Sequence, residues 1–408
     1  MNKLIITEMQ GKIFTAWLSE GRVVQLSAEE KEKPSILGHI YIGKVKNIVK
    51  NIGAAFVEIE EGYIGYYSLT ENKKHLFSNG SDPSSPLRAG DEIIVQVARD
   101  SVKTKAPVLT SNLNFTGRLC VLTTGKNMVG FSTKITDSVW KAQVRERLET
   151  MRNSSFLGPT GRVGIIVRTN AYEAGEEALL KEVRMLSEKG SSLIQNAAYR
   201  TCKTQLDQAY PAYTAALRDS YMGETDEIVT DNRQILDTLM EYMKELPTED
   251  IPKLKFYEDA AFPLCKLYSL ETALERALSP RVWLKSGGYL VIEPTEALTV
   301  IDVNTGKYSG KKTPEETIFK INLEAAEEVA GQLRLRNISG IIIVDFIDMD
   351  KEEKREALLK RLREFCGRDH VKTTVVDITS LNLVEITRKK VKRPLYEQVE
   401  KKQGRAVT

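Results

Sequence analysis

The sequence predicts a multidomain α/β protein, and three patterns along the chain lead to that fold class. Residues 1–112 read as short strands of alternating polarity, and residues 113–215 mix strands with long amphipathic helices. Residues 280–395 alternate strand and helix, which is typical of a sheet covered by helices. A chain of 408 residues is long enough for two or three compact units, each with its own core.

The composition excludes several classes of protein. The chain start has no apolar run of signal-peptide length, and no segment reaches the roughly 20 apolar residues of a membrane span, so we expect a cytoplasmic protein. The net charge of +3 is too small to indicate a nucleic-acid partner by itself. The four cysteines are far apart and form no CxxC pair, which argues against a disulfide framework and against a self-contained zinc knuckle.

The first 112 residues are predicted to form a meander and a barrel. LIITEMQ, KIFTAWLSE and RVVQLSAE in residues 1–35 suit an antiparallel meander that is too short to bury a core alone, so a distant segment should pair with it. GHIYIGKVKNIV, GAAFVEIE, GYIGYYSL and DEIIVQVARD in residues 36–112 fit a small closed barrel of the oligonucleotide-binding (OB) type, with a Ser/Pro/Gly-rich loop at 75–90.

Aromatic side chains on the outer face of such barrels stack unpaired bases, at about 1–3 kcal/mol per base. Strand alternation must also bury one face, so part of the aromatic set is expected in the core. The candidates for base stacking, with lysines close enough in sequence to contact phosphates, are Phe56, Tyr63, Tyr66, Tyr67, Lys44, Lys46 and Lys105.

Helical periodicity predicts the long helices that follow the barrel in the sequence. Apolar spacing indicates helices at 138–151, 176–200 and about 232–245, and the first two flank the strand-like run VGIIVRTNA. In the carboxy-terminal part, Thr313 and Glu316 form a capping box with Pro314 at the first helical position, and another helix follows Asp350.

Two aspartates in the carboxy-terminal strands are the candidate centre of chemistry. Asp302 and Asn304 are two apart on one strand and share a face, and Asp345 comes late in a nearly aliphatic strand, where an unpaired carboxylate is costly. Ligands of α/β sheets bind at the carboxyl ends of strands, so the two aspartates are expected to meet there. Their oxygens suit Mg²⁺, which polarises a phosphoryl oxygen and activates water. The alternative is that backbone amides satisfy both carboxylates at the strand ends.

Other charged residues nearby receive lesser interpretations. Asp348, Asp350 and Asp377 are lesser candidates for the metal site. Asp348 and Asp350 are interpreted as turn or helix-start residues, and the basic tail at 396–408 as a solvated segment. The stretch NTGKYSGKK lacks the GxxxxGK[ST] spacing of a nucleotide-binding loop. Three lysines directly after Asn304 are expected to neutralise phosphate charge: Lys307, Lys311 and Lys312.

Long strings of the sequence resemble the bacterial ribonuclease E/G family. The most specific are SGGYLVIEPTEALTVIDVNTGK, NLEAAEEVAGQLRLRNISGIIIVDFIDM and LVEITRKK, and weaker similarity in GHIYIGKVKNIVKNIGAAFVEI, VGIIVRT and DEIVTDN extends it over nearly the whole chain. The resemblance implies a Mg²⁺-dependent endoribonuclease that cuts single-stranded RNA, leaves 3′-hydroxyl and 5′-phosphate ends, and serves rRNA processing and mRNA decay.

The same resemblance implies a division into domains. The expected parts are an RNase H-like unit of residues 1–35 plus 216–279, an inserted OB-fold RNA-binding barrel at 36–112, an α/β unit at 113–215 that senses the RNA 5′ phosphate, a DNase I-like catalytic unit at 280–395, and the basic tail.

Site residues follow from the resemblance as well. Asp302 and Asp345 correspond to the metal ligands, with Asn304 as the supporting catalytic amide. Arg168 and Thr169 match the 5′-phosphate pocket, in which a guanidinium and a hydroxyl suit a phosphate. The opposite wall of that pocket falls on Gly117 and Val121. The RNA contacts of the barrel fall on Phe56, Tyr66 and Lys105. Tyr66 replaces a usual phenylalanine and keeps a stacking face.

The implied cofactor is Mg²⁺, with Mn²⁺ as a substitute, and the implied partner is single-stranded RNA with a 5′ monophosphate. The family commonly continues after TRKK into a CPxC zinc motif that links protomers, whereas this sequence reads KRPLYEQVEKKQGRAVT. Zinc is therefore not expected. The expected state is a monomer or a homodimer built without zinc. Two other functions stay open: a non-catalytic RNA-binding protein associated with ribosomes, and a phosphatase or DNA nuclease with the same metal pair.

Overall fold

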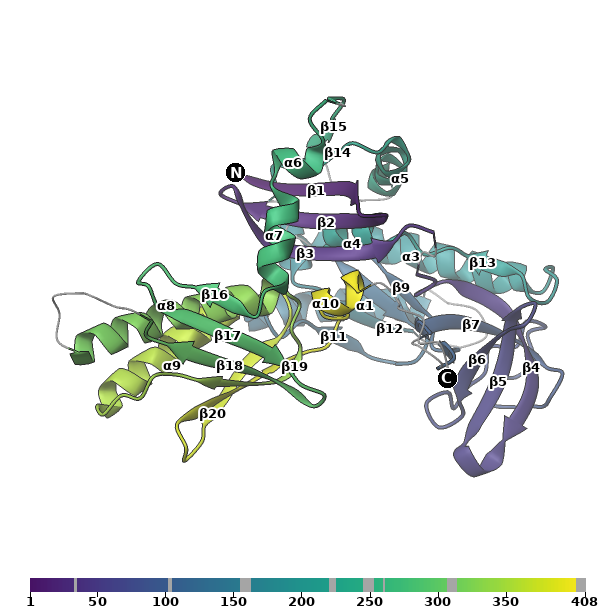
Figure 1. Ribbon diagram of the computed structural model, residues 1–408. Helices are drawn as coiled ribbons and strands as arrows, with labels where there is room; N and C mark the ends of the chain where they lie inside the picture. Colours follow the sequence, from purple (N-terminus) through teal and green to yellow (C-terminus); the bar gives the residue numbers. More distant parts are fainter. Residues whose placement is uncertain are drawn as a thin grey trace, which may run out of the picture. The chain divides into compact units, whose positions relative to one another are not determined.

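The structure is a computed structural model that describes residues 1–32, 35–101, 105–154, 163–219, 225–244, 253–259, 261–306 and 314–400. The chain separates into unit 1, with residues 1–32, 223–237 and 252–408, and unit 2, with residues 33–222 and 238–251. Both units combine sheets with helices, so the predicted α/β class is confirmed (Figure 1). Thr313, the lysines 307, 311 and 312, and residues 401–408 of the basic tail lie outside the described residues.

The first sheet of unit 1 is an antiparallel meander completed by a distant segment. Strand β14 adds to β1 in parallel and β15 adds to β14, which gives the order β15-β14-β1-β2-β3. The predicted pairing of the meander with a distant segment is thus confirmed. The elements are β1 Asn2–Met9, β2 Lys12–Ser19, β3 Arg22–Glu30, β14 Glu227–Thr230, β15 Lys253–Phe256, α6 Leu264–Leu267, α7 Leu270–Leu278 and α10 Leu395–Val399. Ile5, Phe14 and Leu26 form the core with α6, α7 and α10.

The second sheet of unit 1 has the order β16-β17-β18-β19-β21-β20. Strands β18 and β19 run parallel because helix α8 crosses over between them, and the other neighbours run antiparallel. The elements are β16 Arg281–Trp283, β17 Tyr289–Pro294, β18 Leu298–Asn304, α8 Pro314–Leu335, β19 Gly340–Asp345, α9 Glu352–Gly367, β20 Thr373–Ile378 and β21 Leu383–Arg388.

Helices α8 and α9 pack on one face of this sheet (Figure 1). Ile301, Ile342 and Val344 point into the core between sheet and helices and are fully buried. The alternate side chains point the other way, and Val300 and Ile341 are 37% and 51% exposed. The second sheet therefore has an inner face and an exposed outer face.

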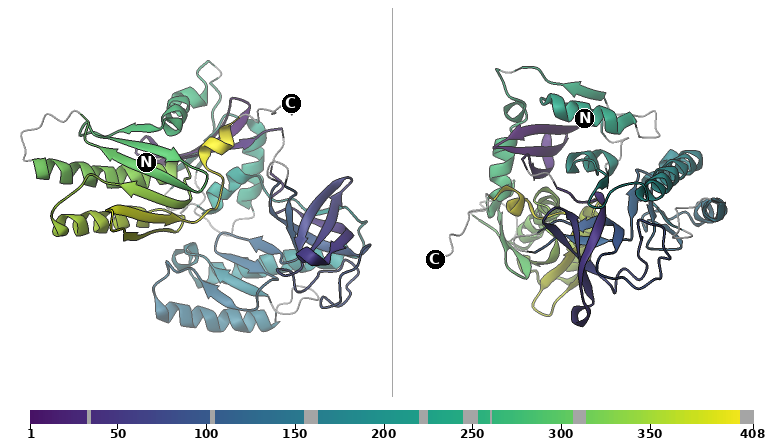
Figure 2. Two further views of the ribbon diagram at one scale, coloured as in Figure 1. Left: turned by 60° about the horizontal axis from the view of Figure 1, so that its bottom comes forward. Right: turned by 90° about the vertical axis from the view of Figure 1, so that its right-hand side faces the viewer.

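Unit 2 contains the predicted barrel, which is confirmed as a closed OB-like barrel (purple and blue strands, Figure 2). Five strands follow the order β4-β5-β6-β8-β7, and β7 pairs back with β4 to close the barrel. The loop expected at 75–90 begins with buried Leu76 and Phe77. The elements are β4 Ile40–Val49, η1 Lys50–Ile52, β5 Ala54–Glu60, β6 Tyr63–Ser68, β7 Glu92–Arg99, β8 Val108–Thr110, and β13 Gln205–Asp207, which pairs with β4.

The rest of unit 2 is a four-stranded sheet of order β11-β12-β10-β9 with helices packed on it. The helices predicted at 138–151, 176–200 and about 232–245 all form. The elements are β9 Asn114–Thr116, β10 Cys120–Thr123, β11 Val129–Phe131, α1 Ser138–Ser154, β12 Gly164–Val167, α2 Asn170–Ala174, α3 Glu176–Ala197 and α4 Ala212–Asp219. Helix α5 Arg233–Lys244 follows β14 in the sequence, and the boundary between the two units falls within it. Within the described ranges, no helix combines the length and apolar character needed to cross a membrane.

Candidate functional site

Strand register brings the two candidate aspartates side by side. In the parallel pair β18–β19, Asp302 lies directly opposite Asp345. Neighbouring strands are about 4.8 Å apart, so the two carboxylates are immediate neighbours. Burial alternates along both strands, with Ile301, Val303 and Val344 buried and both aspartates exposed on the outer face. The pair therefore faces solvent on a rigid sheet.

Asn304 lies on the same face, two residues beyond Asp302. Its Nδ2 donates a hydrogen bond of 2.7 Å to Oδ2 of Asp302, which fixes the orientation of that carboxylate. Strand β18 continues to Asn304, so Asp302 lies within the strand. Asp345 is the last residue of β19 and Asp302 lies two residues before the end of β18, so the two aspartates meet near the carboxyl ends of their strands and project from the outer face of the sheet.

The two carboxylates of the pair affect each other electrostatically. Burial, followed by the negative charges of Asp302 and Asp348, raises the pKa of Asp345 above its usual value. Among the residues that the structure describes, no group of three or more His, Cys, Asp or Glu side chains is arranged to hold a metal. Two carboxylates suit Mg²⁺, which keeps several waters, better than Zn²⁺, which takes three or four protein ligands.

Helix α8 holds the chain that follows Asp345. Asn322 is fully buried. Its Nδ2 donates to the carbonyl oxygen of Ile347 at 2.7 Å, and its Oδ1 accepts from the Ile347 backbone N–H at 3.1 Å. This pair of bonds fixes the turn next to the carboxylates. Sequence reasoning missed Asn322; the available signal was an amide between Ile321 and Ala325 on the apolar face of a helix.

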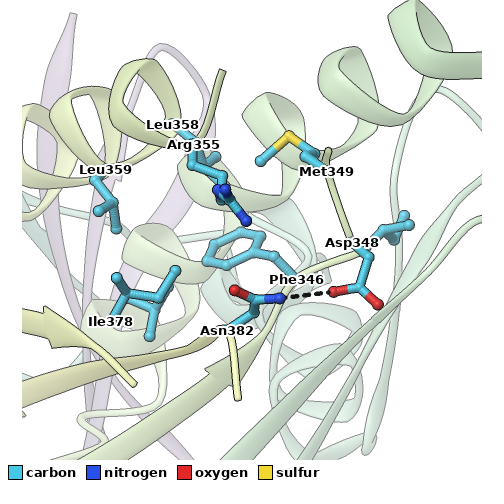
Figure 3. A pocket seen from close by; sticks show the side chains of 10 residues that line it. Phe346, Asp348, Met349, Arg355, Leu358, Leu359, Ile378 and Asn382 are labelled. Atoms are coloured by element: carbon cyan, nitrogen blue, oxygen red, sulfur yellow. Dashed lines mark hydrogen bonds between the residues drawn. The ribbon is translucent and has the colours of Figure 1, made fainter. Parts of the chain in front are cut away.

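A small pocket lies beside this segment, and Asp348 is one of its lining residues. In Figure 3 the side chain of Arg355 lies above the ring of Phe346 and that of Asn382 lies below it. Asn382 Nδ2 donates to Oδ1 of Asp348 at 3.3 Å. Asp348 thus lies in the connection between β19 and α9 and is bonded to Asn382, which lies between β20 and β21.

Glycines allow the loop before β17 to pack against the end of β18. Gly306 has φ +60°, and a Cβ there would lie 2.2 Å from the carbonyl oxygen of Gly287. A Cβ on Gly288 would lie 2.8 Å from the carbonyl oxygen of Asn304. Only glycine fits this close approach, which supports the backbone that carries Asn304.

In unit 2, the four residues expected at a phosphate site lie around one turn. Arg168, directly after β12, donates from Nη1 to the carbonyl oxygen of Gly117 at 3.0 Å. The hydroxyl of Thr169 lies 2.9 Å from that of Ser132. Val121 lies on β10, which pairs with β12 just ahead of Arg168. A guanidinium and two hydroxyls therefore gather at the end of β12.

A buried acid beneath this turn was missed by sequence reasoning. Glu182 on α3 is 1% exposed. Its carboxylate accepts the backbone N–H groups of Arg118, Leu119 and Cys120 at 2.8, 2.7 and 2.9 Å. A Cβ on Gly117 would lie 2.5 Å from that carboxylate, which explains the glycine. The signal in the sequence was a glutamate on the apolar face of α3.

In the barrel, the aromatic candidates separate into two groups. Phe56 and Tyr66 pair across β5 and β6, half-buried, with ring centroids 6.3 Å apart. Tyr67 is a core residue whose hydroxyl donates to Ser111, so its candidacy for base stacking is wrong. Tyr63 is half-buried against the barrel core. Lys105 is exposed and precedes β8, the strand beside β6.

Comparison with known proteins assigns the family. The profile of the Ribonuclease E/G family matches residues 114–391, a range that includes both the Asp302–Asp345 pair and the turn at Gly117. Ribonuclease G of Escherichia coli (strain K12) is 32% identical over 402 residues, 96% of this chain and 81% of that protein. Ribonuclease E of Nostoc sp. is 33% identical over 402 residues, 97% of this chain and 57% of that protein. With the family profile matched over more than half of the chain and relatives aligned over nearly all of it, the protein belongs to the ribonuclease E/G family.

Proposed function

We propose that the protein is an endoribonuclease that hydrolyses phosphodiester bonds in single-stranded RNA with a divalent metal ion, and so acts in RNA processing and decay. The relatives carry the names Ribonuclease G and Ribonuclease E. The observation that carries the proposal is the register of β18 and β19, which sets Asp302 beside Asp345 on an exposed face.

In this proposal Asp302 and Asp345 hold the metal ion, with Mg²⁺ as the expected ion and Mn²⁺ as a substitute. When bound, the ion polarises a phosphoryl oxygen and lowers the pKa of an attacking water. Asn304 donates to one oxygen of Asp302 and keeps that carboxylate oriented. The mutual repulsion of the two carboxylates, which contributes to the raised pKa of Asp345, is what a cation would relieve.

We further propose that Arg168 and Thr169, together with the backbone around Gly117 and Val121, bind the 5′ monophosphate of the RNA. A guanidinium forms charge-assisted hydrogen bonds with phosphate, and the neighbouring hydroxyls of Thr169 and Ser132 can donate to its remaining oxygens. Replacing Thr169 by Val should reduce the preference for a 5′-monophosphorylated over a 5′-hydroxyl oligonucleotide, and an unchanged preference would remove this assignment.

The barrel is the proposed RNA-binding module. Phe56 and Tyr66 offer adjacent rings for stacking, and exposed Lys105 offers a charge for the phosphate backbone. We interpret the sheet β15-β14-β1-β2-β3 as RNase H-like, the sheet β11-β12-β10-β9 as the 5′-sensing unit, and the sheet with Asp302 as DNase I-like. A 5′-end requirement, a homodimer and a cytoplasmic location stay predictions.

Cleavage of a 5′-monophosphorylated single-stranded oligoribonucleotide, with Mg²⁺ and with EDTA, tests the proposed activity. The proposal predicts products only with the metal ion, and no cleavage of the matching DNA. RNA binding without any metal-dependent product would favour the non-catalytic, ribosome-associated alternative. Cleavage of the DNA would favour a different nuclease. Asp377, a lesser candidate, is exposed on β20, which is separated from β19 by β21, so Asp377→Asn provides the matched control.

A further inference from the structure

An aromatic pair lies on the outer face of the sheet that carries the carboxylates. Trp283 ends β16 and Tyr289 begins β17, and the two are directly opposite in register. Their ring centroids are 5.2 Å apart. Trp283 is 65% exposed, whereas its neighbours Val282 and Leu284 supply the side chains that pack on the core. The fold therefore does not need the indole of Trp283 for its interior.

A guanidinium accompanies the two rings. The Cζ atom of Arg281 lies 4.6 Å from the ring centroid of Tyr289 and 5.8 Å from that of Trp283. Arg281 is exposed, so its charge faces solvent beside the rings. Stacking faces next to a fixed positive charge match a nucleotide, which carries a flat base and a negative phosphate. We call Arg281, Trp283 and Tyr289 the aromatic platform.

Strand register connects the aromatic platform to the carboxylate pair. Tyr289 lies directly opposite Asn304, and Val291 lies opposite Asp302. Opposed residues share a face, so Tyr289, Asn304 and Asp302 all lie on the outer face. Tyr289 and Asp302 are diagonal neighbours, whose Cα atoms are typically about 7–8 Å apart and within reach of aromatic side chains. A base stacked on the platform would thus belong to a nucleotide close to the phosphate at Asp302 and Asp345.

We propose that the aromatic platform stacks an unpaired base of the RNA strand, next to the phosphodiester held at the carboxylate pair. This inference rests on the proposed function and deepens it, because a base can stack on Trp283 only when it is free of a duplex. The platform is thereby a specificity-determining subsite that favours single-stranded RNA. Arg281 holds the ring of Tyr289 from one side and contacts the backbone phosphate of the stacked nucleotide.

Tryptophan fluorescence tests the binding step without any cleavage. The sequence contains three tryptophans, and the double variant Trp17→Phe/Trp140→Phe leaves Trp283 as the reporter. Titration with single-stranded oligouridylate in EDTA should quench this fluorescence in a saturable way, and a duplex RNA of equal length should not. Absence of quenching, or equal quenching by the duplex, would overturn the inference. Quenching by anionic lipid vesicles and not by RNA would do the same.

Kinetics distinguish failure of this inference from failure of the proposed function. Trp283→Ala should raise KM for a single-stranded substrate about 10-fold with little change in kcat, since one stacking contact is lost. Trp283→Phe should restore most of the affinity. Ile341→Ala, which removes another exposed apolar side chain of the same face, is the control and should change neither constant. If Trp283→Ala cleaves RNA with the KM of the wild type, the aromatic platform is refuted and the proposed function stands. If single-stranded RNA quenches the fluorescence of Trp283 but the protein never cleaves RNA, the proposed function is refuted and the platform stands.

Discussion

The carboxylate pair of unit 1 and the proposed phosphate-binding turn of unit 2 are built in opposite ways. Asp302 and Asp345 are exposed and owe their proximity to the register of two strands. The turn at Gly117 owes its shape to Glu182, a buried acid that accepts three backbone N–H groups. In unit 1 the two carboxylates proposed to hold the metal ion are therefore expected to be dispensable for folding. In unit 2 the proposed binding site and local stability depend on the same group.

The largest expected effect is on activity. Asp302→Asn or Asp345→Asn should lower RNA cleavage by more than about 100-fold, because loss of even an outer partner of a metal ligand costs about 10–100-fold. Folding should be unaffected or slightly improved: the raised pKa of Asp345 means that its ionised form is disfavoured in the fold, so a neutral amide removes repulsion. The rate of RNA cleavage measures the effect on activity, and thermal unfolding followed by circular dichroism measures the effect on stability. Asp377→Asn should behave as wild type in both measurements. A lowered unfolding midpoint in Asp302→Asn or Asp345→Asn would contradict the contrast drawn between unit 1 and unit 2.

The next effect is on stability in unit 2. Glu182→Ala should destabilise the turn by roughly 3 kcal/mol or more, because three backbone N–H groups lose their acceptor and each unsatisfied group costs about 1–3 kcal/mol. Hydrogen exchange at the amides of Arg118, Leu119 and Cys120 reports the change locally. Glu188→Ala, at an exposed position of the same helix, is the control. Unchanged protection of these amides in Glu182→Ala would show that the buried acid does not hold the turn.

Metal addition should stabilise the wild type through unit 1 alone. A ligand that binds only the folded state adds about 2.7 kcal/mol at 100 times its dissociation constant. Mg²⁺ should therefore raise the unfolding midpoint of the wild type but not that of Asp302→Asn, and EDTA should reverse the shift. Equal shifts in both proteins would place the stabilising ion elsewhere.

The smallest effect is expected from the supporting amide. Asn304→Ala removes one hydrogen bond to Asp302, worth about 0.5–1.5 kcal/mol. The Mg²⁺ concentration for half-maximal cleavage should rise a few-fold, while the maximal rate at saturating Mg²⁺ changes less. A loss as large as that of Asp302→Asn would mean that Asn304 contacts the reacting groups directly.

The same contrast explains what the sequence could predict. Asp302 and Asn304 share a face by strand parity, and Asp345 is conspicuous as an acid ending an aliphatic strand, so this site was recognisable from local patterns. The partner of each residue across the sheet could not be predicted, because long-range pairing sets the register of the strands. That register places Asp302, two residues before the end of β18, opposite Asp345. Glu182 and Asn322 were not identified from the sequence, because one polar residue on an apolar helix face does not reveal which distant backbone groups it bonds. Tyr67 was misjudged since alternation alone does not say which face of a barrel strand is inside.

Direct observation of the bound ion tests the central claim, that Asp302 and Asp345 jointly hold one divalent cation. Mn²⁺ serves as the probe, and electron paramagnetic resonance of the free ion measures how much the protein binds. The account predicts a single tight site in the wild type and in Asp377→Asn, and its loss in both Asp302→Asn and Asp345→Asn. Wild-type Mn²⁺ binding in either of these two variants would contradict it.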